Sequence, residues 1–167
     1  KTSRTSFKLT DKDNFTFLYP KGWKYAIKSI GKEDKSKKIT LTSNDNKSSL
    51  SFLVSKSTQA ITNRKQILQS ATAEIRSKQS NTKEIFYEEM GYDFIKNALA
   101  ALITNTLSSD NSDKQLFITH HIVVSDKYLI RGKLITDDVL SIDYAKAFAI
   151  LTSGIIEKPE IKTDRKL

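Results

Sequence analysis

The sequence contains no cysteine, and among its 167 residues it has only two prolines, five glycines, two histidines and one tryptophan. Without cysteine the chain forms no disulfide, offers no thiolate to a metal and has no cysteine nucleophile. Five glycines leave little material for a phosphate-cradling loop or a dinucleotide fingerprint, and neither pattern occurs, nor does a Gly-x-Ser-x-Gly elbow. No apolar run approaches the roughly 18 residues that cross a bilayer. The commonest catalytic and membrane-spanning signatures are therefore missing.

The composition is that of a folded protein: hydrophobic residues make up 38% of the chain and charged residues 28%. A chain of this length buries a sizeable core without crosslinks. We expect a lead-in over residues 1–13, with a frayed start at 1–6, then one globular domain over 14–156 and a polar tail over 157–167. Because the chain begins at Lys1 rather than at methionine, we also expect that an upstream segment has been removed.

The stretch Phe15–Trp23 organises the expected fold. Phe15, Phe17 and Tyr19 alternate with Thr16 and Leu18, which is the two-residue period of a strand. Pro20 and Gly22 then predict a fixed corner, because proline lacks a backbone N–H and glycine adopts backbone angles closed to other residues. This corner delivers Trp23, which we expect to be buried.

The remaining patterns predict further strands and two helices. We expect extended segments at 25–27, 39–42, 50–54, 84–89, 115–124 and 127–136, with a charged loop over 29–38. A helix after Thr62 or Asn63, either of which would cap it, carries Ile67, Leu68, Ala71 and Ile75 on one stripe and ends near 77–81. A final helix, capped by Asp137 and Asp138, presents Leu140, Tyr144, Ala147, Phe148, Leu151 and Ile155.

The stretch from Tyr92 to Leu107 is ambiguous in its first part. Phe94, Ala98 and Leu102 are four residues apart, as on a helix, whereas the residues after Leu99 alternate as in a strand. We favour a strand from about Leu99 and leave 92–98 open between helix and strand. The element order predicts an α+β fold: an antiparallel sheet of about six strands with helices packed on its faces.

Two segments resemble a known family. Asn-Phe-Thr-Phe-Leu-Tyr-Pro-Lys-Gly-Trp, residues 14–23, resembles the aromatic strand and Pro-x-x-Trp turn that begin the globular domain of PsbP, the extrinsic photosystem II subunit. The late hairpin and the helix Asp-Tyr-Ala-Lys-Ala-Phe-Ala-Ile-Leu-Thr-Ser, residues 143–153, resemble the end of the same domain. The similarity spans roughly Asn14 to Ile156. It extends to the bacterial lipoprotein and Ran-binding relatives of PsbP.

This resemblance implies a PsbP-like α/β/α sandwich and a largely non-catalytic role, because members of the family bind or stabilise other proteins. The bacterial relatives are typically exported and lipid-anchored, so the resemblance also implies a periplasmic or cell-envelope lipoprotein. The long N-terminal segment of the photosynthetic proteins has no counterpart in residues 1–13. An oxygen-evolution role is therefore not implied, and no functional residue transfers by position.

Charge is unevenly distributed along the chain. Residues 1–83 carry a net charge of +12 and residues 84–167 carry −3. The segment 21–38 holds seven lysines against Glu33 and Asp34, and we take these as candidate binding residues: Lys21, Lys24, Lys28, Lys32, Lys35, Lys37 and Lys38. A basic surface attracts acidic proteins and anionic lipid. Nucleic acid is disfavoured, since lysine outnumbers arginine and no aromatic residues are interleaved for stacking. A merely solvated lysine face is the plainer interpretation.

Candidate catalytic groups are few. His120 and His121 are adjacent on an expected strand, where neighbouring side chains point to opposite faces, so they cannot jointly bind one metal ion. We expect one of them to be buried and the other exposed. The carboxylate pairs Glu88-Glu89 and Asp137-Asp138 are more readily structural, and Ser153-Gly154 follows a helix rather than a strand-to-helix elbow.

The sequence therefore favours a non-catalytic exported binding or assembly protein without a cofactor, which recognises an unidentified protein, an acidic one being among the candidates. The alternative is a binder of an anionic polymer or membrane surface through the Lys21–Lys38 region, and an enzyme comes third. Partner identity and oligomeric state are not encoded in any motif.

Overall fold

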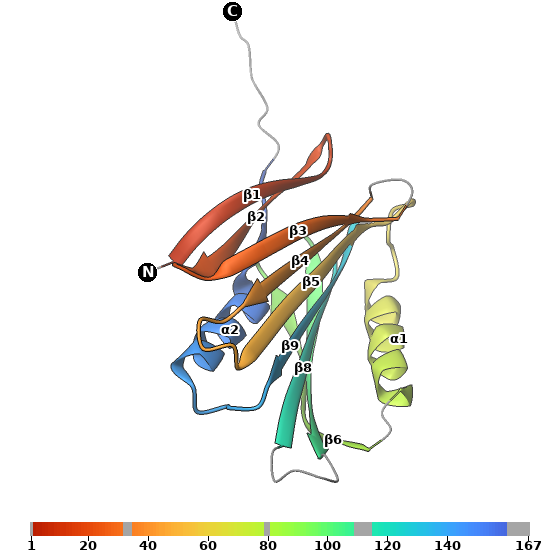
Figure 1. The fold of residues 1–167 in the computed structure, drawn as a ribbon. Coiled ribbons are helices and arrows are strands. Elements are labelled where there is room, and N and C mark those ends of the chain that lie inside the picture. Colours follow the sequence, from red (N-terminus) through yellow and green to blue (C-terminus); the bar gives the residue numbers. More distant parts are fainter. Residues whose placement is uncertain (1, 32–34, 79–80, 109–114, 160–167) are drawn as a thin grey trace, which may run out of the picture.

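The computed structural model describes residues 2–31, 35–78, 81–108 and 115–159. Within these ranges ten strands form two antiparallel sheets, and there are two helices (Figure 1). The smaller sheet has the strand order β1 (Thr2–Thr10), β2 (Asp13–Pro20), β10 (Ile155–Glu157). The larger has the order β3 (Lys24–Ile30), β4 (Ser36–Thr42), β5 (Ser48–Lys56), β9 (Tyr128–Thr136), β8 (Gln115–Val124), β7 (Ala98–Ser108), β6 (Thr82–Tyr92). The helices are α1 (Arg64–Ser77) and α2 (Ile142–Ser153).

The expected fold class is therefore wrong. The described part of the chain is mostly β, with sheets of seven and three strands and only two helices, rather than a six-stranded α/β/α sandwich with layers of helices on both faces. The physical reason lies in the N-terminal half, where β-rich residues form five successive strands before the first helix begins. From β1 to the end of β5 at Lys56 the described residues therefore supply strands rather than a helical layer.

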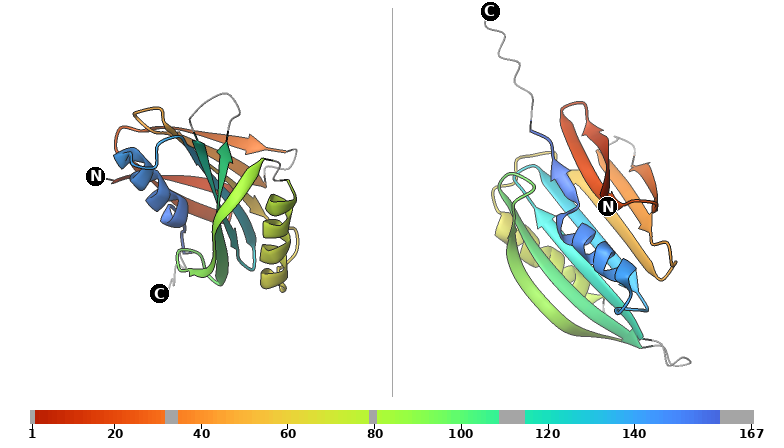
Figure 2. Two further views of the ribbon diagram at one scale, coloured as in Figure 1. Left: turned by 90° about the horizontal axis from the view of Figure 1, so that it is seen from below. Right: turned by 90° about the vertical axis from the view of Figure 1, so that its left-hand side faces the viewer.

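Each helix covers only part of one face of the seven-stranded sheet (Figure 2). Helix α1 contacts β7 and β8 and buries Leu68 and Ala71 against Ala101 and Ile122. Helix α2 contacts β5 and β9 on the opposite face, and also β2 and β10 of the small sheet. Gly132 of β9 permits this approach, since an added Cβ would lie 2.6 Å from a methyl group of Leu151.

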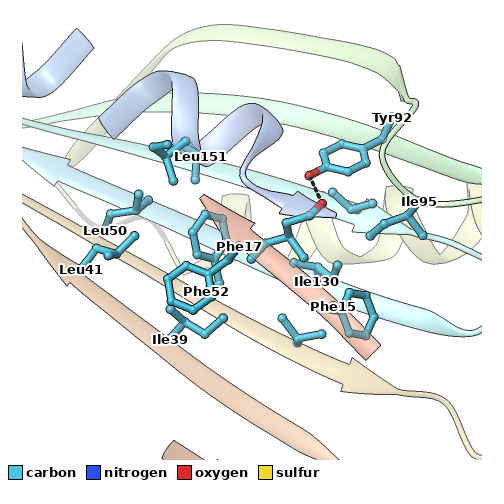
Figure 3. Packing of buried hydrophobic residues seen from close by; sticks show 14 of the residues in the cluster. Phe15, Phe17, Ile39, Leu41, Leu50, Phe52, Tyr92, Ile95, Ile130 and Leu151 are labelled. Carbon is cyan, nitrogen blue, oxygen red and sulfur yellow. Dashed lines mark hydrogen bonds between the residues drawn. The ribbon is translucent and has the colours of Figure 1, made fainter. Parts of the chain in front are cut away.

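The main core fills the space between the small sheet, α2 and the large sheet (Figure 3). Phe15 and Phe17 of β2 are fully buried there and face Phe52 of β5 and Ile130 of β9. The hydroxyl of Tyr92 donates a hydrogen bond of 2.7 Å to the backbone oxygen of Ile155, which ties the end of β6 to β10. This core occupies one face of the large sheet and leaves the other to α1.

The aromatic strand and corner are confirmed. Gly22 has a φ of 91°, the backbone N–H of Trp23 donates to the backbone oxygen of Pro20 at 3.1 Å, and the Trp23 side chain is only 4% exposed. The expected frayed start is wrong, because residues 2–10 form β1 and pair with β2. Phe7 explains this pairing, since its ring stacks on Phe15 with 5.3 Å between ring centroids.

Other expectations are corrected in detail. Ser29 and Ile30 end β3 and residues 36–38 begin β4, so the expected charged loop is shorter, and residues 32–34 lie outside the described part. Residues 93–97 form a turn, neither helix nor strand. Helix α1 begins after Asn63 as expected, although the Asn63 side chain makes no capping bond. The cap of α2 is Ser141, whose side chain accepts from the Asp143 N–H, rather than Asp137 or Asp138.

Candidate functional site

The face of the large sheet that α1 partly covers contains a cavity of about 620 Å³. We call this cavity the α1 groove. It lies between the second half of α1 and strands β4, β5, β7, β8 and β9, with the first residue of β6 at one end. The side chains that line it include Lys38, Ser51, Leu53, Glu74, Ile75, Lys78, Thr82, Asn105, Ile118, His120, Ile122, Arg131 and Lys133.

The floor of the groove is apolar. Leu53 comes from β5, Ile118 and Ile122 come from β8, and Ile75 of α1 faces them. They share one face of the sheet because side chains alternate along each strand and the register places Leu53 opposite Arg131 and Arg131 opposite Ile122. The floor therefore offers an apolar body a place out of water.

Two buried polar atoms at one end of the groove have no hydrogen-bond partner. They are Oδ1 of Asn105, a residue that is only 2% exposed, and Oγ1 of Thr82. A buried acceptor without a partner costs about 1–3 kcal/mol. This cost is recovered when a bound molecule donates a hydrogen bond there.

Cations also line the groove. Lys38 comes from β4, Arg131 and Lys133 come from β9, and Lys78 is the C-cap of α1; a single carboxylate, Glu74, lines the groove with them. Glu74 accepts hydrogen bonds from Lys78 at 3.0 Å and from Arg131 at 3.2 Å. These bonds hold the pKa of Glu74 below its ordinary value, so the groove keeps one negative charge against four positive ones.

His120 lies on the groove floor and His121 lies on the opposite face of the sheet, next to the ring of Tyr92. The side chains of His120 and His121 therefore point in opposite directions, as expected. His121 is buried as expected, but His120 is half-buried rather than exposed, because α1 and the sheet enclose it. Burial lowers the pKa of both histidines to about 4, and for His120 the charges of Lys133 and Arg131 add to the effect. Both imidazoles are therefore neutral near pH 7.

The candidate lysines are spread over the β3–β4 hairpin and its ends. Lys28 and Lys38 are opposite each other, and Lys24 shares their face, whereas Lys37 points to the other face and donates to Ser29 at 2.6 Å. Lys21 lies in the exposed turn before β3, Lys35 directly precedes β4, and Lys32 lies outside the described residues. Among the candidates that the structure describes, Lys38 alone lines the α1 groove.

The paired carboxylates do not converge on a site. Glu88 and Glu89 diverge to opposite faces of β6, as their strand partners Leu102 and Ala101 do. Asp138 bonds the Leu140 N–H and forms an ion pair of 3.2 Å with Lys47. Over the described residues no group of three or more His, Asp or Glu side chains could hold a metal ion. Neither helix is long and apolar enough to span a membrane within the same ranges.

Most groove residues were not predicted from the sequence. His120 lies next to Arg131 and Lys133 only through the β8–β9 register, and Glu74 and Lys78 belong to α1 and its C-cap, more than forty residues earlier. One signal was available: the strand 128–136 carries two cations at alternate positions, Arg131 and Lys133, on the face opposite its buried residues Tyr128, Ile130 and Leu134. Packing into the core does not explain two charged side chains on one face of a strand.

A second exposed feature lies at the β9–α2 connection, where Leu140 is 92% exposed and Ile142 is 76% exposed. The Ser141 hydroxyl donates to Asp45 at 2.7 Å, the Asp45 N–H donates to Asp143 at 3.2 Å, and Lys47 bonds Asp138. These bonds clamp the connection to the β4–β5 turn. We call Leu140 and Ile142, held in this way, the apolar tip.

Fold and groove together define a mostly β, two-sheet protein with a ligand-sized cavity beside its first helix. No protein-family model matches the chain, and no curated protein matches its sequence. Among solved structures the fold is similar to that of LpqN, described as involved in cell envelope biogenesis of Mycobacterium tuberculosis. The TM-score is 0.62 at 12% sequence identity, over 95% of this chain and 92% of LpqN.

At 12% identity this likeness concerns the fold alone, and at that level it supports in part the resemblance drawn from the sequence. The layered α/β/α arrangement that the resemblance implied is not what this chain forms.

Proposed function

We propose that this chain is a non-catalytic binding protein of the cell envelope, and that its α1 groove holds a small molecule with an apolar body. The observation that carries the proposal is the groove itself: a cavity of about 620 Å³ with an apolar floor and a buried, unpartnered acceptor at one end. Ligand sites in proteins typically have volumes of about 300–1,000 Å³, with mostly apolar walls and a few placed polar groups. The likeness to LpqN supports the envelope setting.

A binding role fits the groove better than catalysis. A general base needs a group to orient it, and among the described residues nothing donates to or accepts from His120. The carboxylate of Glu74 is held by Lys78 and Arg131. The groove thus offers surface, charge and hydrogen-bonding groups, without a nucleophile paired to a base.

Titration with N-phenyl-1-naphthylamine, a neutral dye that fluoresces in apolar sites, tests this proposal. We expect saturable binding that Ser51→Phe weakens at least tenfold, because residue 51 lies on the groove face of β5 and a ring there fills the cavity. Ser49→Phe, on the same face of the strand but outside the groove, serves as the matched control and leaves binding unchanged. Absence of saturable binding, or equal loss in both variants, would contradict the proposal.

The apolar tip favours a second function, recognition of a protein partner. Two large aliphatic side chains are exposed here, in a segment that hydrogen bonds hold in place. This exposure is unfavourable if the surface contacts only water. The residues around the tip include Asp45, Asp138 and Asp143. The partner that fits is a protein with an apolar pocket rimmed by cations.

A photo-crosslinking amino acid placed at residue 140 tests this second function in the native envelope. One discrete product is expected, and the protein in it should carry a cation-rimmed apolar pocket. Placement at Lys146, exposed on α2, is the control and should give no such product. The same products from both positions, or none from residue 140, would rule the tip out.

A further inference from the structure

The α1 groove has chemically different ends, and this asymmetry specifies its ligand. At one end, on β4 and β9, lie cations, and at the other, on β6 and β7, lie polar atoms without partners. Between them are Ile118, Ile122 and Ile75. We infer, on the basis of the proposed function, that the ligand is an amphipathic anion: an acidic group among Lys38, Arg131 and Lys133, an apolar chain over the floor, and a hydroxyl near Asn105.

The register brings the three cations around one spot. Lys38 is opposite Leu53, and Leu53 is opposite Arg131, so the two cations flank one leucine at a distance of two strands, about 10 Å. Lys133 is two residues along β9 from Arg131, on the same face and about 7 Å away. Long side chains rooted at this spacing can converge on one acidic group above Leu53 and Ser51.

Two of these cations are available. Among the described residues no hydrogen bond or ion pair engages the Nζ atoms of Lys38 or Lys133, whereas Arg131 and Lys78 share Glu74. Lysines beside an apolar floor, with one carboxylate among four cations, create a positive potential that disfavours a cationic ligand. The neutral state of His120, caused in part by Lys133 and Arg131, reports the same potential.

Asn105 sets the position of the second polar group. It lies on β7 opposite Ile118 of β8, and β8 is the neighbour of β9, so Asn105 is two strands, about 10 Å, from the strand that carries Lys133. Its Oδ1 accepts but does not donate, so the ligand group beside it must be a donor such as a hydroxyl. A chain of eight to ten carbons spans this separation.

Four probes with one chain length separate the contributions: ω-hydroxydecanoate, decanoate, decanol and decyltrimethylammonium. Isothermal titration of the full chain at low salt should rank them in that order, with decanoate bound at least tenfold more tightly than decyltrimethylammonium. The hydroxyl should add a further gain of about fivefold. Raising the salt should weaken the two acids and leave decanol unchanged.

Variants assign each contribution to its residues. Lys38→Gln with Lys133→Gln should weaken both acids about tenfold and leave decanol unaffected, while Lys65→Gln with Lys146→Gln, two exposed lysines outside the groove, removes equal charge without effect. Asn105→Leu should bring ω-hydroxydecanoate down to the affinity of decanoate. Circular dichroism spectra matching the wild type keep these comparisons valid.

Results that contradict the anion preference, the role of Asn105 and the proposed function differ from one another. If decanol or decyltrimethylammonium binds as tightly as decanoate, or if both double-lysine variants weaken the acids equally, the groove does not select anions and the inference fails while the proposed function stands. If Asn105→Leu leaves the gain from the hydroxyl intact, the assignment of that group fails. If neither these probes nor the neutral dye binds, the proposed function itself fails.

Discussion

Glu74 of α1 accepts a hydrogen bond of 3.2 Å from the guanidinium of Arg131 on β9, and this bond spans the α1 groove from helix to floor. Lys78, the C-cap of α1, bonds the other oxygen of the same carboxylate at 3.0 Å. One acidic residue thus occupies two of the four groove cations. The carboxylate competes with any anion for the same donors.

Replacing Glu74 should therefore strengthen anion binding. Glu74→Gln frees Arg131 and Lys78 from an ionic partner and makes the groove more positive by one charge, so decanoate should bind several-fold more tightly in a calorimetric titration. Glu88→Gln changes the net charge equally on the opposite sheet face and should have no effect. Weaker binding in Glu74→Gln would show that the carboxylate positions the cations instead of competing for them.

In the protein without a ligand, Asn105 should lower the free energy of unfolding. Its Oδ1 is buried without a partner, and a similarly shaped leucine has no such group, so Asn105→Leu should raise the free energy of unfolding by about 1 kcal/mol. Urea denaturation measures this difference. Asn105→Asp is the opposing variant and should be strongly destabilised, because a carboxylate would be buried there. A destabilised Asn105→Leu would mean that the amide is satisfied in the native protein.

Trp23 should be a large contributor to stability through packing alone. It is 4% exposed and its indole N–H has no partner, so Trp23→Ala should cost about 3–5 kcal/mol. Trp23→Phe should cost clearly less, because no hydrogen bond is lost. Urea denaturation compares the two, and blue-shifted native fluorescence inaccessible to quenchers checks the burial. Equal costs for both variants would indicate that the N–H makes a bond in solution.

The sequence predicted the elements whose pattern is local. Alternation placed the strands around Phe17 and Tyr128, helical spacing placed α1, and Pro20 with Gly22 placed the corner before Trp23, all of which the structure contains. It failed for β1, because a strand of mixed polar residues is stabilised by Phe7 stacking on Phe15 and by pairing with β2, neither of which has a local signal.

The groove could not be predicted from a local sequence pattern, for the same reason. The lysines of 21–38 are close in sequence, yet alternation turns Lys37 to one face and Lys38 to the other. Lys28 lies opposite Lys38 on β3, whereas the groove cations Arg131 and Lys133 come from β9 and reach Lys38 through β5. Proximity in sequence indicated a charged segment, whereas the strand order of the sheet determines which charges share a cavity.

The two histidines should make stability depend on pH. Burial lowers the pKa of His120 and His121 to about 4, whereas in the unfolded chain both titrate near 6.5. The unfolded state therefore takes up protons first, and stability should fall as the pH drops from about 6.5 to about 4, with no contribution from the histidines above that range. Denaturation in urea at several pH values should give a slope approaching 2.7 kcal/mol per pH unit for two protons. His121→Leu should halve the slope, and an unchanged slope would contradict the assignment.

A buried cluster at Asp13 should hold the two sheets together. Asp13 of β2 is 5% exposed and accepts hydrogen bonds from the Tyr128 hydroxyl of β9, from the Thr10 hydroxyl and, at 2.6 Å, from Lys56 of β5. Burial alone would raise the pKa of Asp13, but the hydrogen bonds from Lys56, Thr10 and Tyr128 outweigh it and hold the pKa below its ordinary value. The stabilisation is therefore present above about pH 4 and is lost as the pH falls through the lowered pKa.

Removing this carboxylate should cost more than removing any one of its donors. Asp13→Ala leaves the Tyr128 hydroxyl buried without an acceptor and should lower the free energy of unfolding by about 2–4 kcal/mol, whereas Tyr128→Phe leaves Asp13 with two donors and should cost about 1–2 kcal/mol. The double variant should cost less than the sum, because both changes remove the same bond. Urea denaturation of the four proteins at pH 7 measures this coupling. Additive costs would show that Asp13 and Tyr128 stabilise the sheets independently.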